Sequence, residues 1–204
     1  MTIATYGALK TAVQSYYNGR SDFPTTVYDL ATAELNARLD LRIMQTETDL
    51  SLTGGTQNVA LPSDFLRPIH AYIDSGGVRY VLDQADEFNS NVGYRSSGMP
   101  GQYVIISGNL LTNPVPDDDY TLTLRYTAKL DDFSADADTN AVLTTHPALY
   151  LYGSLKHVAT WAQDAEALAF YTGQFEGEIR RAQEQNDRAQ FGMGPLRVRA
   201  AHAP

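Results

Sequence analysis

The apolar residues near the N-terminus recur with a helical repeat. Between Thr5, a suitable N-cap, and Asn18, residues such as Leu9 and Val13 return to one face of a short amphipathic helix. A second helix is predicted after Pro24, where Thr26 has the form of a capping-box residue with Asp29 three positions later. The apolar face predicted for this second helix consists of Val27, Leu30, Ala33, Ala37 and Leu41.

The repeat then shortens to two residues, which is typical of strands with one buried face. Met44 to Leu52 alternate in this way, with apolar residues or threonine at the even positions and polar residues at the odd ones. Turn residues separate the later alternating stretches, as in β-hairpins. The predicted elements are hairpins over 69–82 and 103–111, a strand over 121–126, and a short helix near Gln84 to Phe88.

Helical spacing returns after Thr144-Thr145, where Pro147 marks the first turn of a helix that reaches Trp161. A further helix carries apolar residues such as Phe175 and Ala182 on one face and is strongly polar from Glu176 onward. The last twelve residues, from Met193 to Pro204, contain no acid and are predicted to form an extended arm.

These periods predict an α+β fold. N- and C-terminal helices, from residues 1–42 and 143–192, are expected to form a helical bundle. Residues 43–142 are expected to form an inserted, mostly antiparallel β module, as a sandwich or as a curled sheet. Residues 193–204 form the expected C-terminal arm.

Composition narrows the classes of function. The 204 residues include 43% hydrophobic and 19% charged residues, and no cysteine, so disulfides and cysteine metal sites are excluded. The net charge of −9 disfavours a protein that grips DNA by its phosphates. No apolar run approaches the roughly 20 residues of a membrane span, so we expect a soluble protein that is not secreted and has no membrane partner.

Motifs for catalysis or metal binding are weak. Asp136, Asp138 and Asn140 fall at the first, third and fifth positions of a calcium loop, but the glycine and the final glutamate of that pattern are missing. His70, His146, His157 and His202 show no metal-ligand spacing. No nucleophile elbow or phosphate loop is present. We therefore expect no catalytic, metal or cofactor-binding residues.

Several short stretches carry a resemblance to a known family. In the first half they are Tyr6-Gly7-Ala8-Leu9-Lys10, Ala33 to Arg42, and Val59-Ala60-Leu61-Pro62-Ser63-Asp64-Phe65-Leu66. In the second half they are Gly98-Met99-Pro100 with Tyr103, Leu110 to Pro116, Tyr120 to Tyr126, and Pro147-Ala148-Leu149-Tyr150-Leu151-Tyr152-Gly153. By their order and spacing together, the chain resembles over nearly its whole length the adaptor, or head-to-tail connector, proteins of podovirus-like tailed phages.

The resemblance implies a structural protein of the virion, made in the host cytoplasm and placed between head and tail. It implies a ring of about twelve identical subunits beneath the portal protein, with tail proteins attached below and genomic DNA passing through. In such rings a C-terminal segment often reaches the portal. Here the candidates are Leu196 and Val198 as apolar anchors and Arg197 and Arg199 as bidentate donors.

Two other classes of function remain open from the sequence. A helical protein with a β module could be a tail accessory that binds a receptor or a glycan, and it would then expose aromatic side chains on its β loops. A hydrolase is the other alternative, for which the sequence offers only isolated candidates: His70, Asp132 and His157.

Overall fold

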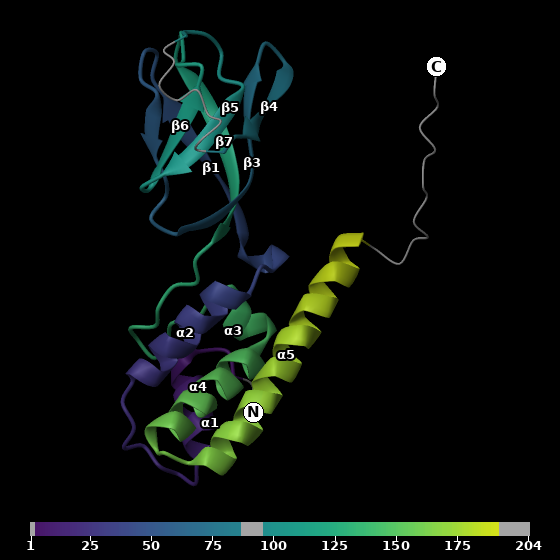
Figure 1. The fold of residues 1–204 in the computed structure, drawn as a ribbon. Helices are drawn as coiled ribbons and strands as arrows, with labels where there is room; N and C mark the ends of the chain where they lie inside the picture. The colour runs from purple at the N-terminus through teal and green to yellow at the C-terminus, as the bar shows by residue number, and fades with distance from the viewer. Residues whose placement is uncertain (1–2, 87–95, 192–204) are drawn as a thin grey trace. The chain divides into compact units, whose positions relative to one another are not determined.

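The computed structural model describes residues 3–86 and 96–191. The chain divides into two compact units. A helical unit joins Met1–Leu41 to the chain from Asp132 onward, and a β unit consists of Arg42–Asp131. Five α-helices and a seven-stranded sheet lie within the described residues, so the predicted α+β class is confirmed (Figure 1).

The helical unit holds all five α-helices. They are α1 (Tyr6–Tyr16), α2 (Thr26–Arg38), α3 (Ala141–Thr145), α4 (Pro147–Trp161) and α5 (Ala165–Phe191). Thr5 caps α1 as predicted, because its side chain accepts a hydrogen bond from the Ala8 N–H at 3.3 Å. The short helix α3 was not predicted. Asn140 caps it by accepting from the Leu143 N–H at 2.9 Å.

The predicted apolar face of the second helix was right at its two ends, Val27 and Leu41, which are buried, and wrong between them. Leu30, Ala33 and Ala37 are exposed, and the buried residues are Val27, Tyr28, Ala31, Thr32, Leu35 and Asn36. The buried face includes two polar residues, so apolar spacing pointed to the neighbouring face instead. The predicted capping box was also wrong, because the N-cap is Thr25 and its side chain makes no capping hydrogen bond.

Helix α4 is the centre of the helical unit, since it packs against each of the other four helices. Gly153 permits a close approach between helices. A Cβ at this position would lie 3.2 Å from the Phe175 ring and 3.4 Å from the Ala31 Cβ. The absence of a side chain at Gly153 thus lets α2 and α5 pack tightly on α4.

The β unit contains one sheet with the strand order β1-β7-β3-β4-β5-β6-β2. The strands are β1 (Gln45–Leu52), β2 (Asn58–Ala60), β3 (Phe65–Ser75), β4 (Val78–Gln84), β5 (Gln102–Ile106), β6 (Asn109–Asn113) and β7 (Tyr120–Ala128). All neighbours pair antiparallel except β4 and β5, which pair in parallel at two positions only. Strands β1 and β2 stand at the two ends of this order and contact each other, so the sheet is curled.

The alternation of apolar and polar residues predicted most strands of this sheet. The even positions Leu50 and Leu52 of β1 are buried with Ile73 of β3 and Leu122 and Leu124 of β7, and both predicted hairpins are present as β3–β4 and β5–β6.

Two details of the β unit differ from the prediction. Strand β2 was not predicted. The predicted helix near Gln84 is wrong at its start, because Gln84 belongs to β4 and the following Ala85 N–H bonds to the Tyr103 carbonyl at 2.8 Å. Phe88, at the other end of that prediction, lies outside the described residues, as does the predicted arm, residues 193–204.

Candidate functional site

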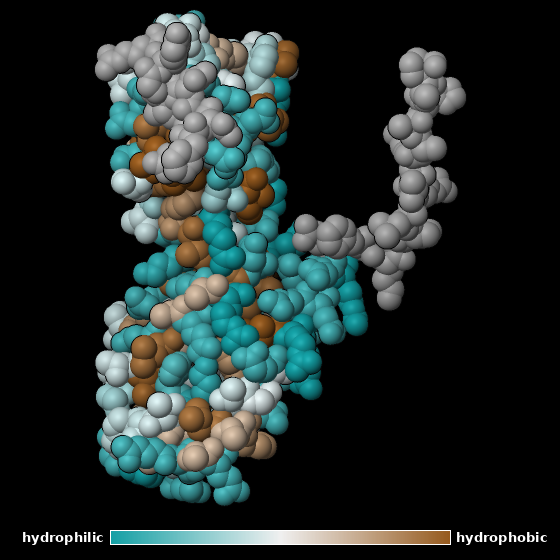
Figure 2. Space-filling view, in the orientation of Figure 1, coloured by the Kyte–Doolittle hydropathy of each residue, from teal (hydrophilic) through white to brown (hydrophobic). Residues whose placement is uncertain are grey.

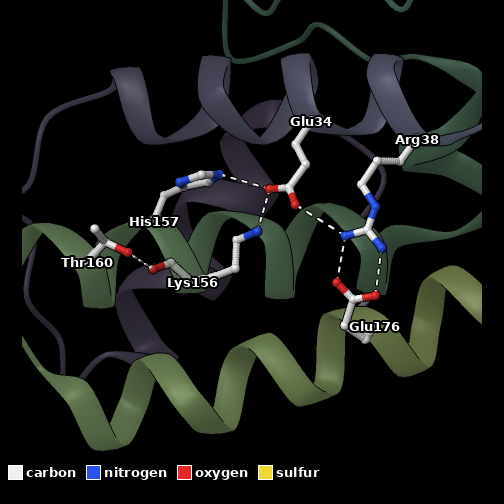
Figure 3. Close-up of polar contacts among 6 residues, drawn as sticks. All are labelled: Glu34, Arg38, Lys156, His157, Thr160 and Glu176. Atoms are coloured by element: carbon white, nitrogen blue, oxygen red, sulfur yellow. Dashed lines mark hydrogen bonds and ion pairs between the residues drawn. The ribbon is translucent and has the colours of Figure 1, made fainter.

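A cluster of charged side chains joins three helices of the helical unit. Glu34 and Arg38 come from α2, Lys156 and His157 from α4, and Glu176 from α5 (Figure 3). Glu34 accepts a hydrogen bond from Lys156 through one carboxylate oxygen and one from Arg38, at 3.3 Å, through the other. Arg38 also donates two hydrogen bonds to Glu176, each 2.6 Å long. Glu34 and Arg38 therefore connect α2 to both other helices.

Helical spacing explains why these groups meet. Glu34 and Arg38 are four residues apart and so share one face of α2. Lys156 lies one turn beyond Gly153 on α4, close to where that glycine brings α2 and α5 together. Lys156 and Arg38 also lie over the Phe175 ring, at 4.7 Å and 5.6 Å from its centroid.

The cluster is half-buried, and its electrostatics favour one charge state. Burial opposes ionisation of Glu34, but the hydrogen bonds from Lys156 and Arg38 outweigh it and lower the pKa of Glu34. The hydrogen bond from Arg38 lowers the pKa of Glu176. Burial and the neighbouring Lys156 charge lower the pKa of His157, and Glu34 offsets only part of that effect. His157 is therefore neutral at pH 7 beside an ionised glutamate.

These contacts suit a structural role better than a chemical one. The Nε2 atom of His157 lies 3.3 Å from a Glu34 oxygen but makes no aligned hydrogen bond. The nearby Thr160 hydroxyl donates to the Lys156 carbonyl at 2.9 Å, so it is no activated nucleophile. Among the described residues, no group of three histidines and carboxylates could hold a metal ion.

The three residues that match part of the calcium-loop pattern make other contacts. Asp136 pairs with Lys10, and Asn140 caps α3. Asp138 accepts hydrogen bonds from the N–H groups of Ser134 and Ala135, each at 2.7 Å, and these bonds lower its pKa. All three side chains thus stabilise the segment that leads into α3.

Exposed apolar side chains mark candidate interaction surfaces. In the β unit, three of them lie on one strand, β4: Val78, Tyr80 and Val81 are 52%, 43% and 61% exposed. Apolar surface is visible over this strand (Figure 2). Among the residues of the helical unit whose burial is described, the exposed aromatic ones are Tyr16, Trp161 and Phe170. The sequence analysis did not identify these surfaces, because burial depends on the tertiary contacts of each strand and helix.

Comparison with known families decides the class of protein. A family model described as SU10 adaptor protein matches residues 4–199, which is nearly the whole chain. The chain belongs to the SU10 adaptor protein family. The resemblance to phage adaptor, or head-to-tail connector, proteins is confirmed by this match. No curated protein matches the chain.

Family membership makes the chain a phage adaptor protein and implies a structural, non-enzymatic role. It also implies a virion component at the head–tail junction that binds other phage proteins. Within the described part of the adaptor, no helix is long and apolar enough to cross a membrane.

The residues named for the alternative functions do not form a site. His70 belongs to the β unit and stacks on Tyr72, whereas Asp132 and His157 belong to the helical unit. No hydrogen bond or ion pair of the described residues joins any two of these three groups. The proposed portal-binding residues, Leu196, Arg197, Val198 and Arg199, lie outside the described residues.

Proposed function

We propose that this adaptor assembles as a ring, of about twelve identical subunits, that docks under the phage portal. The ring continues the DNA channel and is the platform to which tail proteins attach. The family match over residues 4–199 is the observation that carries this proposal. The subunits assemble in the host cytoplasm and remain in the virion at the head–tail junction.

The charge of the chain supports the proposal. Genomic DNA has to slide through the channel during ejection, and attraction to its phosphates would slow it. The net charge of −9 opposes such attraction, so the DNA passes without sequence-specific binding.

The C-terminal arm is the proposed contact with the portal. Leu196 and Val198 alternate with Arg197 and Arg199, so an extended arm presents its apolar and its cationic side chains on opposite faces. Arginine forms bidentate pairs with carboxylates, which fits an acidic surface on the portal.

Co-sedimentation with purified portal rings tests the proposal. We expect saturable binding at one adaptor per portal subunit. Removal of Met193 to Pro204, or the double substitution Arg197→Gln with Arg199→Gln, should abolish sedimentation with the portal while the circular dichroism spectrum stays unchanged. Full binding by both variants would contradict the role of the arm.

The matched control removes the same charge elsewhere. Arg181 and Arg188 of α5 have side chains that are 72% and 76% exposed, so Arg181→Gln with Arg188→Gln lowers the net charge equally without disturbing the core. This control should bind the portal normally. Failure of the unmodified, folded adaptor to bind portal rings would contradict the proposed function and favour a tail accessory that binds a receptor or a glycan.

A further inference from the structure

One edge of strand β4 is open. Ala71–Ser75 of β3 pair with Val78–Leu82 on one side, whereas β5 pairs only with Asp83 and Gln84 on the other. No strand of the described chain covers the second edge of residues 78–82. Figure 1 shows β4 at the margin of the β unit.

Backbone groups that could pair with another strand point outward along this edge. The Asp83 N–H bonds to the Gly101 carbonyl at 3.0 Å, and the Ala85 N–H bonds to the Tyr103 carbonyl. Because alternate residues of a strand direct their N–H and C=O groups to the same edge, those of Arg79 and Val81 face the open part. Four hydrogen-bonding groups are thus available over residues 79–81.

The open edge lacks the features that keep strands from pairing. Residues 78–82 contain no proline or lysine. Their one charge, Arg79, is turned back over β3, where it donates two hydrogen bonds to Asp74, at 2.9 and 2.8 Å, and lies 3.7 Å from the Tyr72 ring centroid. The exposed Val78, Tyr80 and Val81 are what a partner would bury.

A suitable partner strand exists on the same chain. Strand β1 is the other outer strand of the antiparallel set β1-β7-β3-β4, and it pairs only with β7. Strand β2 lies nearby, but its three residues span about 10 Å and cannot cover the eight residues of β1. Residues such as Gln45 to Asp49 therefore keep a free edge within the described β unit.

The directions of β1 and β4 favour pairing with a second copy that has the same orientation as the first. Each neighbour in the set of four is antiparallel, so β1 and β4 run in opposite directions. A second copy placed beside the first without inversion brings its β1 antiparallel to β4. Such a head-to-tail contact repeats around a ring, whereas β4 pairing with β4 requires a two-fold axis and stops at a dimer.

Side chains on the two strands also match. Leu82 of β4 and Leu50 of β1 belong to the core, whereas Arg79 and Val81 of β4 and the odd residues of β1 lie on the outer face. On the outer face, Arg79 of β4 would keep its hydrogen bonds to Asp74 and add a longer-range attraction to the exposed Glu47 and Asp49 of the partner's β1. Opposite charges facing each other across an antiparallel pair stabilise the pairing.

We propose that the open edge of β4 binds β1 of a second copy of this chain, so that neighbouring subunits share one continuous antiparallel sheet. The proposal rests on the ring of the proposed function and identifies a subunit contact within it.

Disulfide cross-linking tests this contact cleanly, because the natural chain has no cysteine. Val81→Cys is combined in turn with Gln45→Cys, Glu47→Cys and Asp49→Cys, which covers adjacent registers on the outer face. After mild oxidation, at high protein concentration and on portal rings, we expect at least one pair to give a ladder of covalent multimers on a non-reducing gel. Each single variant should stay monomeric on that gel.

Control variants separate this contact from other pairings. Val81→Cys with Arg181→Cys places the second thiol on α5, outside the β unit, and should give no ladder. A dimer from Val81→Cys alone would show β4–β4 pairing and overturn the proposal. So would the absence of a ladder, in solution and on the portal, from all three β1 pairs.

A substitution at the edge gives a second readout. Val81→Lys adds a charge at a position that is 61% exposed, so the monomer should fold normally. We expect at least a tenfold weaker self-association by sedimentation velocity, whereas the helical control Leu30→Lys, at a position of α2 that is 52% exposed, should not change it. Equal self-association of both variants would overturn the proposal, while normal portal binding in the same samples would leave the proposed function standing.

Discussion

Arg38 donates from two guanidinium nitrogens to the two carboxylate oxygens of Glu176, each at 2.6 Å. The residues lie 138 positions apart in the sequence, on α2 and α5, and this bidentate pair joins the first and last parts of the helical unit. Both side chains are about one-third exposed or more, at 34% and 42%, so solvent weakens the pair.

We expect a coupling free energy of about 0.5–1 kcal/mol between Arg38 and Glu176. It is obtained from urea unfolding of Arg38→Lys, Glu176→Gln and the double variant. Lysine keeps the charge but cannot donate from two nitrogens to one carboxylate, so Arg38→Lys should lose most of the coupling. Additive single effects would show that the bidentate contact contributes nothing to stability.

Glu34 should contribute more than Glu176. Its side chain is 22% exposed and accepts from both Lys156 and Arg38. Glu34→Gln leaves the charge of Lys156, which is 15% exposed, without a countercharge, and should lower the free energy of unfolding by about 1–3 kcal/mol. The matched control is Glu184→Gln on α5, where the side chain is 66% exposed and the expected change in urea unfolding is within about 0.5 kcal/mol.

His157 should make the stability of the helical unit depend on pH. Burial lowers its pKa below the ordinary value of 6.5 in the folded state, so the unfolded chain binds a proton more readily. The stabilisation is fully present above pH 6.5 and is lost as the pH falls toward the lower folded pKa. The pKa of His146, also lowered by burial, acts in the same direction.

Thermal unfolding between pH 7.5 and pH 5 measures this effect. The unmodified adaptor should lose stability over that range, and His157→Gln should lose less. His70→Gln, in the β unit, is the control and should follow the unmodified protein. A pH dependence that His157→Gln leaves unchanged would contradict the assignment.

Gly153 should tolerate no side chain. A methyl group there would meet the Phe175 ring at 3.2 Å, so Gly153→Ala should destabilise the protein by about 1–3 kcal/mol in spite of the better helix propensity of alanine. Gly173 and Gly177, both within α5, have open space around the same position. Alanine at either should therefore be neutral or stabilise by up to about 1 kcal/mol.

All three substitutions add one methyl group, but the free energy of unfolding should fall for Gly153→Ala and stay equal or rise for the other two. Chemical denaturation measures this difference. A stabilising effect of Gly153→Ala would show that α2, α4 and α5 pack less closely than the distances indicate. A loss of stability in Gly173→Ala would contradict the open space around that position.

Local sequence patterns predicted most of the helices and strands, and they indicated the class of protein. Alternation over Met44 to Leu52 and the turn residues of the two hairpins depend on local backbone geometry, which is encoded in neighbouring residues. Thr5 and Pro147 marked helix starts for the same reason. The order and spacing of short stretches indicated the adaptor family, and the family match confirmed it.

Tertiary structure decided which face each element buries and which charges meet. The buried face of α2 includes Thr32 and Asn36, so hydropathy alone selected the wrong side. Glu34 and Lys156 are 122 residues apart, and they meet because α2 packs on α4, where Gly153 leaves room for Ala31. The open edge of β4 follows from the order of strands in the sheet, which no local pattern encodes, because pairing between distant strands depends on the whole fold.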